Sequence, residues 1–374
     1  MKIQAAVLET VGATRPYSVS RPLRVDELDL APPGLNEVLI RIKAAGLCHS
    51  DLSVINGDRP RPTPMALGHE AAGIVEALGE GVTDLAVGDH VVLVFVPSCG
   101  HCQPCAEGRP ALCEPGAAAN GAGTLLGGAR RLTRAGQTIN HHLGCSAFAS
   151  HAVVSRRSVI KVDRELPFEH AALFGCAVLT GVGAVINTAR VRAGSTVAVV
   201  GLGGVGLASV LGAVAAGARQ VIAIDLADDK LELAQSLGAT HTFNAGSTGV
   251  IEAIREVSTG GVDTAIEMAG STRAFEIAYR ITRRGGTTVT AGLPPPDATW
   301  AMPVVNLVAE ERTIKGSYVG TCVPLRDIPR YVDLFRAGRL PVDRLLSGSL
   351  TLDNINHGFD LLHQGKAVRQ VVLL

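Results

Sequence analysis

The chain has 374 residues, 47% of them hydrophobic, and its 34 Lys and Arg residues balance 34 Asp and Glu residues. This length predicts two domains or one large α/β unit, and the apolar fraction excludes a disordered chain. Zero net charge argues against nucleic-acid binding and against attachment to a membrane through a basic face. The scarcity of aromatic residues argues against stacking on single-stranded nucleic acid.

Short β-rich runs separated by Gly and Pro turns dominate residues 1–177. The first residues form an apolar run that is too short for a signal peptide and is typical of a strand. Further strands are expected at Glu37–Ala44, Ala71–Leu78 and His90–Phe95. The glycine-rich stretch Glu114–Gly136 is expected to be a loop.

From about Thr196 the pattern changes to strands alternating with helices, which predicts a parallel sheet with right-handed crossovers. The expected strands are Thr196–Val200, Gln220–Ile224, Val262–Glu267 and Thr287–Ala291. The expected helices are Val205–Ala216, Asp228–Leu237, Val250–Val257 and Thr272–Arg283. Two more helices, Leu325–Ala337 and Asp353–His363, precede a last strand at Arg369–Leu374.

The longest apolar stretches, Ala171–Ile186 and Leu207–Ala216, contain Gly and small residues, and we expect both to fall short of the ~20 residues of a membrane span. We therefore expect a cytoplasmic protein with no membrane partner. In a reducing compartment the eight cysteines are better explained as metal ligands or buried thiols than as disulfides.

A glycine-rich turn follows the strand at Thr196–Val200. In such a turn Gly201 permits the sharp bend, Gly203 lets the backbone approach a pyrophosphate, and Gly206 lets the helix pack closely on the strand. Asp225 ends the next strand, where a carboxylate accepts hydrogen bonds from a ribose 2′-hydroxyl and repels a 2′-phosphate. The pattern predicts a dinucleotide site that favours NAD over NADP.

Four cysteines lie within fifteen residues, at Cys99, Cys102, Cys105 and Cys113. Four thiolates suit tetrahedral Zn²⁺ and leave no open position, so this spacing predicts a structural zinc site in a lobe at about residues 97–115. An iron–sulfur site is the alternative. His101 lies inside the lobe, but four cysteines already saturate the metal.

Three further segments hold metal-ligand types: Cys48 to Asp51, His69 with Glu70, and Cys176. One histidine and two cysteines leave zinc a fourth position, as a catalytic zinc requires. No spacing rule joins Cys176 to the other two, and isolated cysteines are usually buried core residues. The local pattern is compatible with a catalytic zinc site and with buried core cysteines.

Taken together and in this order, these motifs resemble those of the zinc-dependent medium-chain alcohol dehydrogenases over nearly the whole chain. The resemblance implies a GroES-like β-rich catalytic domain and a Rossmann doubly wound parallel sheet, with the active site and the cofactor in the cleft between the two domains. It divides the chain into residues 1–177 and 320–374 for the catalytic domain and 178–319 for the NAD-binding domain. It implies two zinc ions per subunit, the catalytic one bound by Cys48, His69 and Cys176.

The resemblance also assigns roles to other residues. Asp51 hydrogen-bonds His69, Glu70 lies beside the zinc, and Ser50 is the first acceptor of the alcohol proton. The cofactor-binding residues that it implies are His49, Thr180, Gly201, Gly203, Gly204, Val205, Gly206, Asp225, Lys230 and Arg369.

Two positions depart from the pattern of many relatives. Ser53 stands where a histidine often completes the proton relay, so we expect water or the cofactor ribose to carry the last step. His49 stands where many relatives have arginine against the pyrophosphate. Its weaker, titratable charge predicts NADH binding that weakens above pH ~7.

The substrate pocket is implied to include Phe95, Phe148, Arg59 and Leu293, with core packing as the alternative for the two phenylalanines. Arg59 would admit a carboxylate or a bulky polar substrate, and a solvent-facing loop arginine is the alternative. Small Ala147 and Leu293 are compatible with medium-chain or aromatic primary alcohols.

The expected activity is the zinc-dependent, reversible oxidation of such an alcohol to an aldehyde with NAD. The alternatives are a thiol-dependent formaldehyde dehydrogenase, which Arg59 argues against, a polyol dehydrogenase, and a non-catalytic nucleotide-binding relative. The long loop at Glu114–Gly136 is associated with dimers in this family. It favours a homodimer joined through residues 300–320, and Cys145 and Cys322 are expected to be buried thiols.

Overall fold

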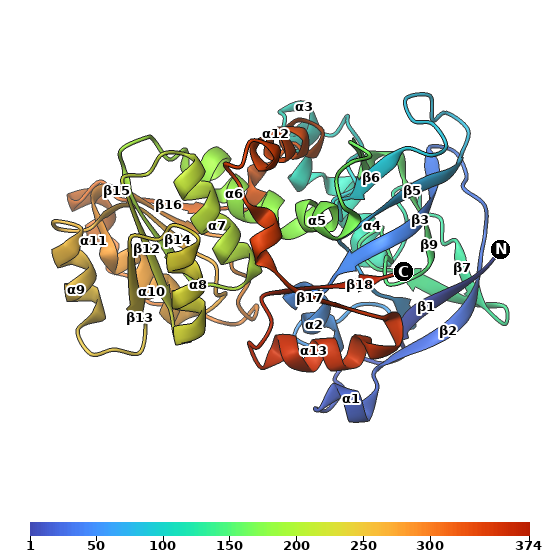
Figure 1. Ribbon diagram of the computed structural model, residues 1–374, viewed down its shortest axis with the longest axis horizontal. Coiled ribbons are helices and arrows are strands. Elements are labelled where there is room, and N and C mark those ends of the chain that lie inside the picture. The colour runs from blue at the N-terminus through green and yellow to red at the C-terminus, as the bar shows by residue number, and fades with distance from the viewer. The chain divides into compact units, whose positions relative to one another are not determined.

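Two compact units make up the chain in the computed structural model, which describes all residues from 1 to 374 (Figure 1). The first unit contains residues 1–176, 323–329 and 346–374, and the second contains residues 177–322 and 330–345. The expected division differs at residues 177, 320–322 and 330–345, which the sequence placed with the first unit. Arg344 explains the difference at 330–345, because its guanidinium donates hydrogen bonds to Ser236 of the second unit.

A closed barrel and a seven-stranded sheet form the first unit. The barrel strands, in spatial order, are β1 (Lys2–Leu8), β2 (Leu23–Leu30), β7 (Leu132–Arg134), β8 (Gln137–His141) and β4 (Met65–Ala66). The sheet strands, in order, are β10 (Val159–Val162), β6 (His90–Leu93), β5 (Ala71–Leu78), β3 (Glu37–Gly46), β18 (Arg369–Leu373) and β17 (Leu346–Leu350), with β9 (His151–Ser155) also paired to β3. Alternate apolar side chains such as Ile3, Ala5 and Val7 of β1 face a shared buried core.

Helices of the first unit are short. They are α1 (Tyr17–Ser20), α2 (His49–Ile55), α3 (Gln103–Ala106), α4 (Glu114–Ala122), α5 (Phe168–Leu173) and α13 (Ile355–His363), and α12 (Pro324–Arg336) is shared by the two units.

The expectation of a loop at Glu114–Gly136 is wrong, because α4 and β7 lie within it. Helix α4 begins where the Cys113 sulfur accepts the N–H of Gly116, and it ends at Gly123, whose φ is +68°. The many glycines of this segment concealed these two capping signals.

A six-stranded parallel sheet forms the second unit, in the doubly wound order β13-β12-β11-β14-β15-β16. Its strands are β11 (Thr196–Val200), β12 (Gln220–Asp225), β13 (His241–Asn244), β14 (Val262–Glu267), β15 (Thr282–Thr290) and β16 (Thr313–Gly316). Its helices are α6 (Leu179–Gly183), α7 (Gly204–Ala215), α8 (Asp228–Ser236), α9 (Val250–Val257), α10 (Thr272–Ile281) and α11 (Val305–Ala309). The sequence missed β13, a half-buried edge strand of four residues.

Every second residue of the central strands, such as Ala198 and Val200, packs against α9 and α10. The intervening residues Val197 and Val199 are buried as well. Strands buried on both faces are typical of an α/β sheet covered by helices on each side.

Helices α5 and α6 join through π-helical turns into one continuous helix, Phe168–Ala189. At 22 residues and a mean hydropathy of 1.7 it is long and apolar enough to cross a membrane. The expected shortfall in length is therefore wrong. However, 83% of its apolar window is buried inside the protein, as in the core helix of a globular protein.

Candidate metal centres and dinucleotide site

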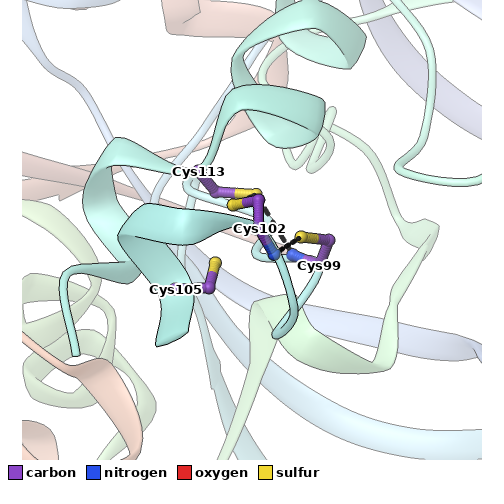
Figure 2. Close-up of side chains that lie close together, drawn as sticks. All are labelled: Cys99, Cys102, Cys105 and Cys113. Carbon is purple, nitrogen blue, oxygen red and sulfur yellow. Dashed lines mark hydrogen bonds between the residues drawn. The ribbon is translucent and has the colours of Figure 1, made fainter. Parts of the chain in front are cut away.

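The four cysteines of the lobe converge, as Figure 2 shows. The sulfurs of Cys99, Cys102, Cys105 and Cys113 all lie within 4.8 Å of one another, and the Cys102 and Cys113 sulfurs are 3.9 Å apart. Four sulfurs at about 2.3 Å from a zinc ion are about 3.8 Å from each other, so the group fits tetrahedral zinc.

Backbone N–H groups point at these sulfurs. Cys99 donates its N–H to the Cys113 sulfur, and Cys102 donates its N–H to the Cys99 sulfur. Backbone N–H groups of His101 and Cys102 lower the pKa of Cys99 to about 6, since they stabilise the thiolate that binds metal. His101 is exposed, and its ring contacts the Cys99 carbonyl.

A second cluster gathers Cys48, His69 and Cys176, whose ligand atoms also lie within 4.8 Å of one another. All three are buried, with Cys48 6%, His69 0% and Cys176 5% exposed. Cys48 precedes α2, His69 lies between β4 and β5, and Cys176 lies in the π-helical turn after α5. A π-helical turn holds an extra residue, which changes the direction of nearby side chains, and such turns are frequent at functional sites.

Asp51 fixes the orientation of the histidine in this cluster. Its Oδ1 lies 3.0 Å from His69 Nδ1, and its Oδ2 accepts the N–H of Cys48. His69 Nε2 is then buried without a hydrogen-bond partner. A buried acceptor left unpaired beside two thiols fits a missing metal ion, and three ligands leave a zinc ion one open position.

Electrostatics in the cluster favour one ionised thiol, since the hydrogen bond with Cys48 raises the pKa of Cys176 well above its usual range. A hydrogen bond from Cys176 lowers the pKa of Cys48 well below its usual range. Burial alone would lower the pKa of His69, but the Asp51 carboxylate outweighs burial and raises this pKa well above normal. Two sulfurs and an imidazole here compete for protons. A divalent cation that binds this donor set displaces those protons.

Glu70 forms a buried ion pair that the sequence did not reveal. Its Oε1 lies 2.5 Å from Arg369 Nη1, and the guanidinium also donates to the Leu47 carbonyl. Burial raises the pKa of Glu70 to about 7, even though Arg369 opposes this shift. Gly46 must be glycine here, because a Cβ would lie 2.5 Å from Glu70 Oε1. The expected contact of Arg369 with pyrophosphate stays a prediction.

A second histidine faces Asp51. Nδ1 of His142 lies 3.3 Å from Asp51 Oδ1, and His142 is 1% exposed. Sequence reasoning missed this residue, since it belongs to no motif. The only signal was the pair His141–His142 at the end of an alternating strand.

In the glycine-rich turn, the local structure requires glycine at positions 201 and 206, whereas a larger residue would fit at position 203. Gly201 has a φ of +93°, and a Cβ on Gly206 would lie 1.8 Å from the Gly201 carbonyl oxygen. A Cβ on Gly203 would meet nothing within 4 Å. Open space at the N-terminus of α7 fits close approach of a phosphate to the backbone.

Asp225 lies at the carboxyl end of β12 with its carboxylate held by backbone N–H groups. Oδ2 accepts the N–H of Leu202, and Oδ1 accepts those of Leu226 and Ala227. These three backbone donors fix the position of the carboxylate beside the glycine-rich turn. Thr180, Gly203, Val205 and Lys230 are partly exposed, Gly204 is buried, and their cofactor contacts stay predictions.

Of the expected pocket residues, Phe95 lies closest to the described site, with its ring edge-on to His69 at a centroid distance of 5.1 Å. Phe148 is fully buried and packs against Phe359, in agreement with the core alternative. Leu293 is 53% exposed. Arg59 is half-buried and donates its backbone N–H to the Ser53 carbonyl.

Ser50 is half-buried in the first turn of α2 and His49 is exposed. The Ser53 hydroxyl donates to the His49 carbonyl, 2.8 Å away. Its proton is thus engaged by the backbone, and the expected route of the proton relay stays a prediction.

Comparison with known proteins adds the family. Residues 34–164 match the alcohol dehydrogenase GroES-like domain, and residues 204–337 match the zinc-binding dehydrogenase domain. An alcohol dehydrogenase zinc-binding domain protein from Burkholderia ambifaria is 38% identical, with a TM-score of 0.94 over 100% of this chain and 99% of that chain.

Benzyl alcohol dehydrogenase from Acinetobacter calcoaceticus is 34% identical, with a TM-score of 0.93 over 100% of this chain and 99% of its own. A zinc-binding dehydrogenase from Sinorhizobium meliloti, solved with NADP, is 28% identical, with a TM-score of 0.82 over the full length of both chains. With both domains matched and the metal-ligand clusters in place, the chain belongs to the zinc-dependent alcohol dehydrogenases of the medium-chain superfamily, and it is an oxidoreductase.

Proposed function

We propose that the protein oxidises a primary alcohol, medium-chain or aromatic, to the aldehyde with NAD⁺, reversibly and with zinc. The observation that carries this proposal is the buried cluster of Cys48, His69 and Cys176, with His69 Nε2 left without a protein partner. Zinc held by these three residues would act as a Lewis acid that lowers the pKa of the alcohol substrate. The four-cysteine lobe would hold a second, structural zinc ion.

Around that centre the chain's own residues handle charge and protons. Asp51 holds His69 in one tautomer. Ser50 accepts the alcohol proton, and water or the cofactor ribose takes it onward because the Ser53 hydroxyl is already engaged. NAD⁺ supplies the hydride acceptor.

The preference for NAD⁺ is supported by Asp225. A fixed carboxylate at the end of β12 accepts bonds from a ribose 2′-hydroxyl and repels a 2′-phosphate. The Sinorhizobium protein was solved with NADP, so both cofactors belong in the test. Asp225→Ser should narrow the preference for NAD⁺ over NADP⁺ by at least about tenfold in kcat/KM.

An aromatic or medium-chain substrate is supported by the Acinetobacter benzyl alcohol dehydrogenase and by the apolar ring of Phe95 against His69. The test is absorbance at 340 nm with NAD⁺ or NADP⁺ and a panel of ethanol, hexanol, benzyl and cinnamyl alcohols, hydroxy acids and polyols. Turnover led by benzyl alcohol or hexanol supports the proposal. Turnover of formaldehyde only with an added thiol, or of polyols or hydroxy acids first, contradicts the substrate class.

We also propose a cytoplasmic homodimer joined at the edge of the parallel sheet. The eight free thiols support a reducing compartment. Edge strand β16 offers unpaired backbone groups, and Val304, Val305 and Val308, which precede it in the chain, are 67%, 67% and 79% exposed. Val308→Asp should shift the sedimenting species from dimer to monomer, and a wild-type monomer contradicts the proposal.

A further inference from the structure

His142 is a buried polar residue next to the Cys48, His69 and Cys176 cluster, and the proposed function does not use it. It follows β8 directly and is 1% exposed. Its Nδ1 lies 3.3 Å from Asp51 Oδ1 but completes no regular hydrogen bond there. Buried polar atoms are normally hydrogen-bonded, so a buried Nδ1 that faces a carboxylate without a regular hydrogen bond needs an explanation.

Asp51 is shared by three groups from three segments. Its Oδ2 takes the N–H of Cys48, and its Oδ1 faces Nδ1 of both His69 and His142. The carboxylate is fully buried. A buried charge needs several donors around it, and here two of those donors belong to the residues that would bind the metal.

The backbone holds His142 in this place. Its N–H donates to the Ser146 hydroxyl at 3.0 Å, and its carbonyl accepts the N–H groups of Cys145 and Ser146. Leu143 and Ser146 have φ of +51°, a region that side-chain-bearing residues rarely adopt. The His142 ring meets the His69 ring edge-on at a centroid distance of 5.7 Å.

We propose that His142 is a positioning residue for the catalytic zinc centre. At Oδ1, the carboxylate oxygen that Cys48 does not bond, it holds Asp51 so that His69 keeps Nε2 directed at the metal. It does not touch the metal. This role rests on the proposed function, because it requires zinc at Cys48, His69 and Cys176.

The neighbouring His141 provides a matched control. It is equally buried, at 1% exposed, but its Nε2 accepts the N–H of Arg131, and no contact joins it to Asp51. Replacing either histidine with leucine removes one buried imidazole from the same turn. Only the change at 142 removes a group that faces Asp51.

The experiment measures metal release from the holoenzyme to a chelator, with zinc and then with Co²⁺ in its place. The wild type should release two metal ions per chain in two phases, one for each centre. His142→Leu should release the metal of the Cys48, His69 and Cys176 centre about 10- to 100-fold faster, the usual effect of losing a partner behind a metal ligand. The Co²⁺ absorption bands should shift, whereas release from the four-cysteine lobe should not change.

His142→Asn keeps an N–H donor and should restore most of the slow release, which a purely space-filling role would not predict. Unchanged release and an unchanged Co²⁺ spectrum in His142→Leu overturn the role of His142 alone. Equal acceleration in His141→Leu also overturns it, since the effect would then be packing. A wild type that binds metal only in the lobe overturns the proposed function together with this role.

Discussion

The two metal centres of the first unit are built in opposite ways. The lobe takes all four ligands from one run of fifteen residues, and three of these four cysteines, all but Cys113, are partly exposed. The other centre takes three ligands from three distant segments, all buried, and surrounds them with Asp51, Glu70 and Arg369, which are buried too. The lobe satisfies a metal completely, whereas the buried centre leaves one position to be filled by something else.

This difference separates stability from chemistry. A saturated cluster near the surface can only cross-link the chain. An unsaturated cluster in a low-dielectric interior strengthens every charge interaction with a bound reactant. Mutations in the buried centre should therefore lower turnover, and mutations in the lobe should lower stability.

The largest effect is expected at the buried centre. Cys176→Ser should lower turnover by about 1,000-fold or more, because the metal loses one of three ligands. Metal analysis should find one zinc ion per chain instead of two, with a nearly unchanged melting temperature. Cys145→Ser is the control, since Cys145 is a buried thiol outside both centres. Two zinc ions and near-normal turnover in Cys176→Ser would remove the distinction between the centres.

The reverse result is expected in the lobe. Cys105→Ser should lower the free energy of unfolding by on the order of 3 kcal/mol, because a cross-linking metal is lost. Limited proteolysis should then cut between residues 99 and 113. Turnover of the folded fraction at low temperature should stay within about tenfold of wild type. His101→Ala, an exposed change in the same loop, should do neither, and a stable but inactive Cys105→Ser would refute the assignment.

A third prediction concerns how strongly the interior near the buried centre excludes charge. Burial, with Arg130 and Arg131 nearby, lowers the pKa of His141 to about 3. Between pH 6.5 and 3 the unfolded chain therefore binds more protons than the folded one, so stability falls as pH falls. For this residue the loss from pH 7 to pH 5 is about 2 kcal/mol.

His141→Gln should flatten that part of the pH dependence, because glutamine keeps an acceptor for the Arg131 N–H but does not titrate. The check is urea unfolding of both proteins at pH 7, 6 and 5. If the free energy of unfolding varied with pH in the same way for both proteins, His141 would be taking up a proton in the folded state.

The smallest effect is expected at the start of α2. Ser53→His should change the pH profile of hydride transfer by less than about tenfold at any pH, because it adds a second proton carrier to a relay that already works. Pre-steady-state NADH formation from pH 6 to 9 is the measurement. Ser53→Ala, which removes only the bond to the His49 carbonyl, is the control, and identical profiles for histidine and serine would exclude a relay through this position.

The same contrast explains what could be predicted from the sequence. When the metal ligands are neighbours along the chain, as in the lobe, their spacing predicts the metal site. The glycine turn and Asp225 were also predictable, since a strand, a turn and the next strand keep a fixed order in this fold. Cys176 could be joined to Cys48 and His69 only through the family resemblance, because tertiary structure alone brings them together.

Contacts made across the fold were not predictable. The pairing of Glu70 with Arg369 and of Asp51 with His142 depends on which distant segments become neighbours, and no local pattern records it. Helix α4 and strand β13 were missed for another reason: capping through a cysteine sulfur and a short, half-buried edge strand leave weak periodic signals.

The ion pair of Glu70 and Arg369 also sets an order of events during protein synthesis. The two residues are 299 positions apart, which at ribosomal speed corresponds to roughly 15 to 60 s. Until Arg369 emerges, Glu70 has no cation to balance it, and a buried unpaired carboxylate favours the neutral form or an open chain. The nascent first unit can therefore gather Cys48, His69 and Cys176 early but completes their surroundings last. The charge balance beside the metal ligands therefore waits for Arg369, long after the ligands themselves have been synthesised.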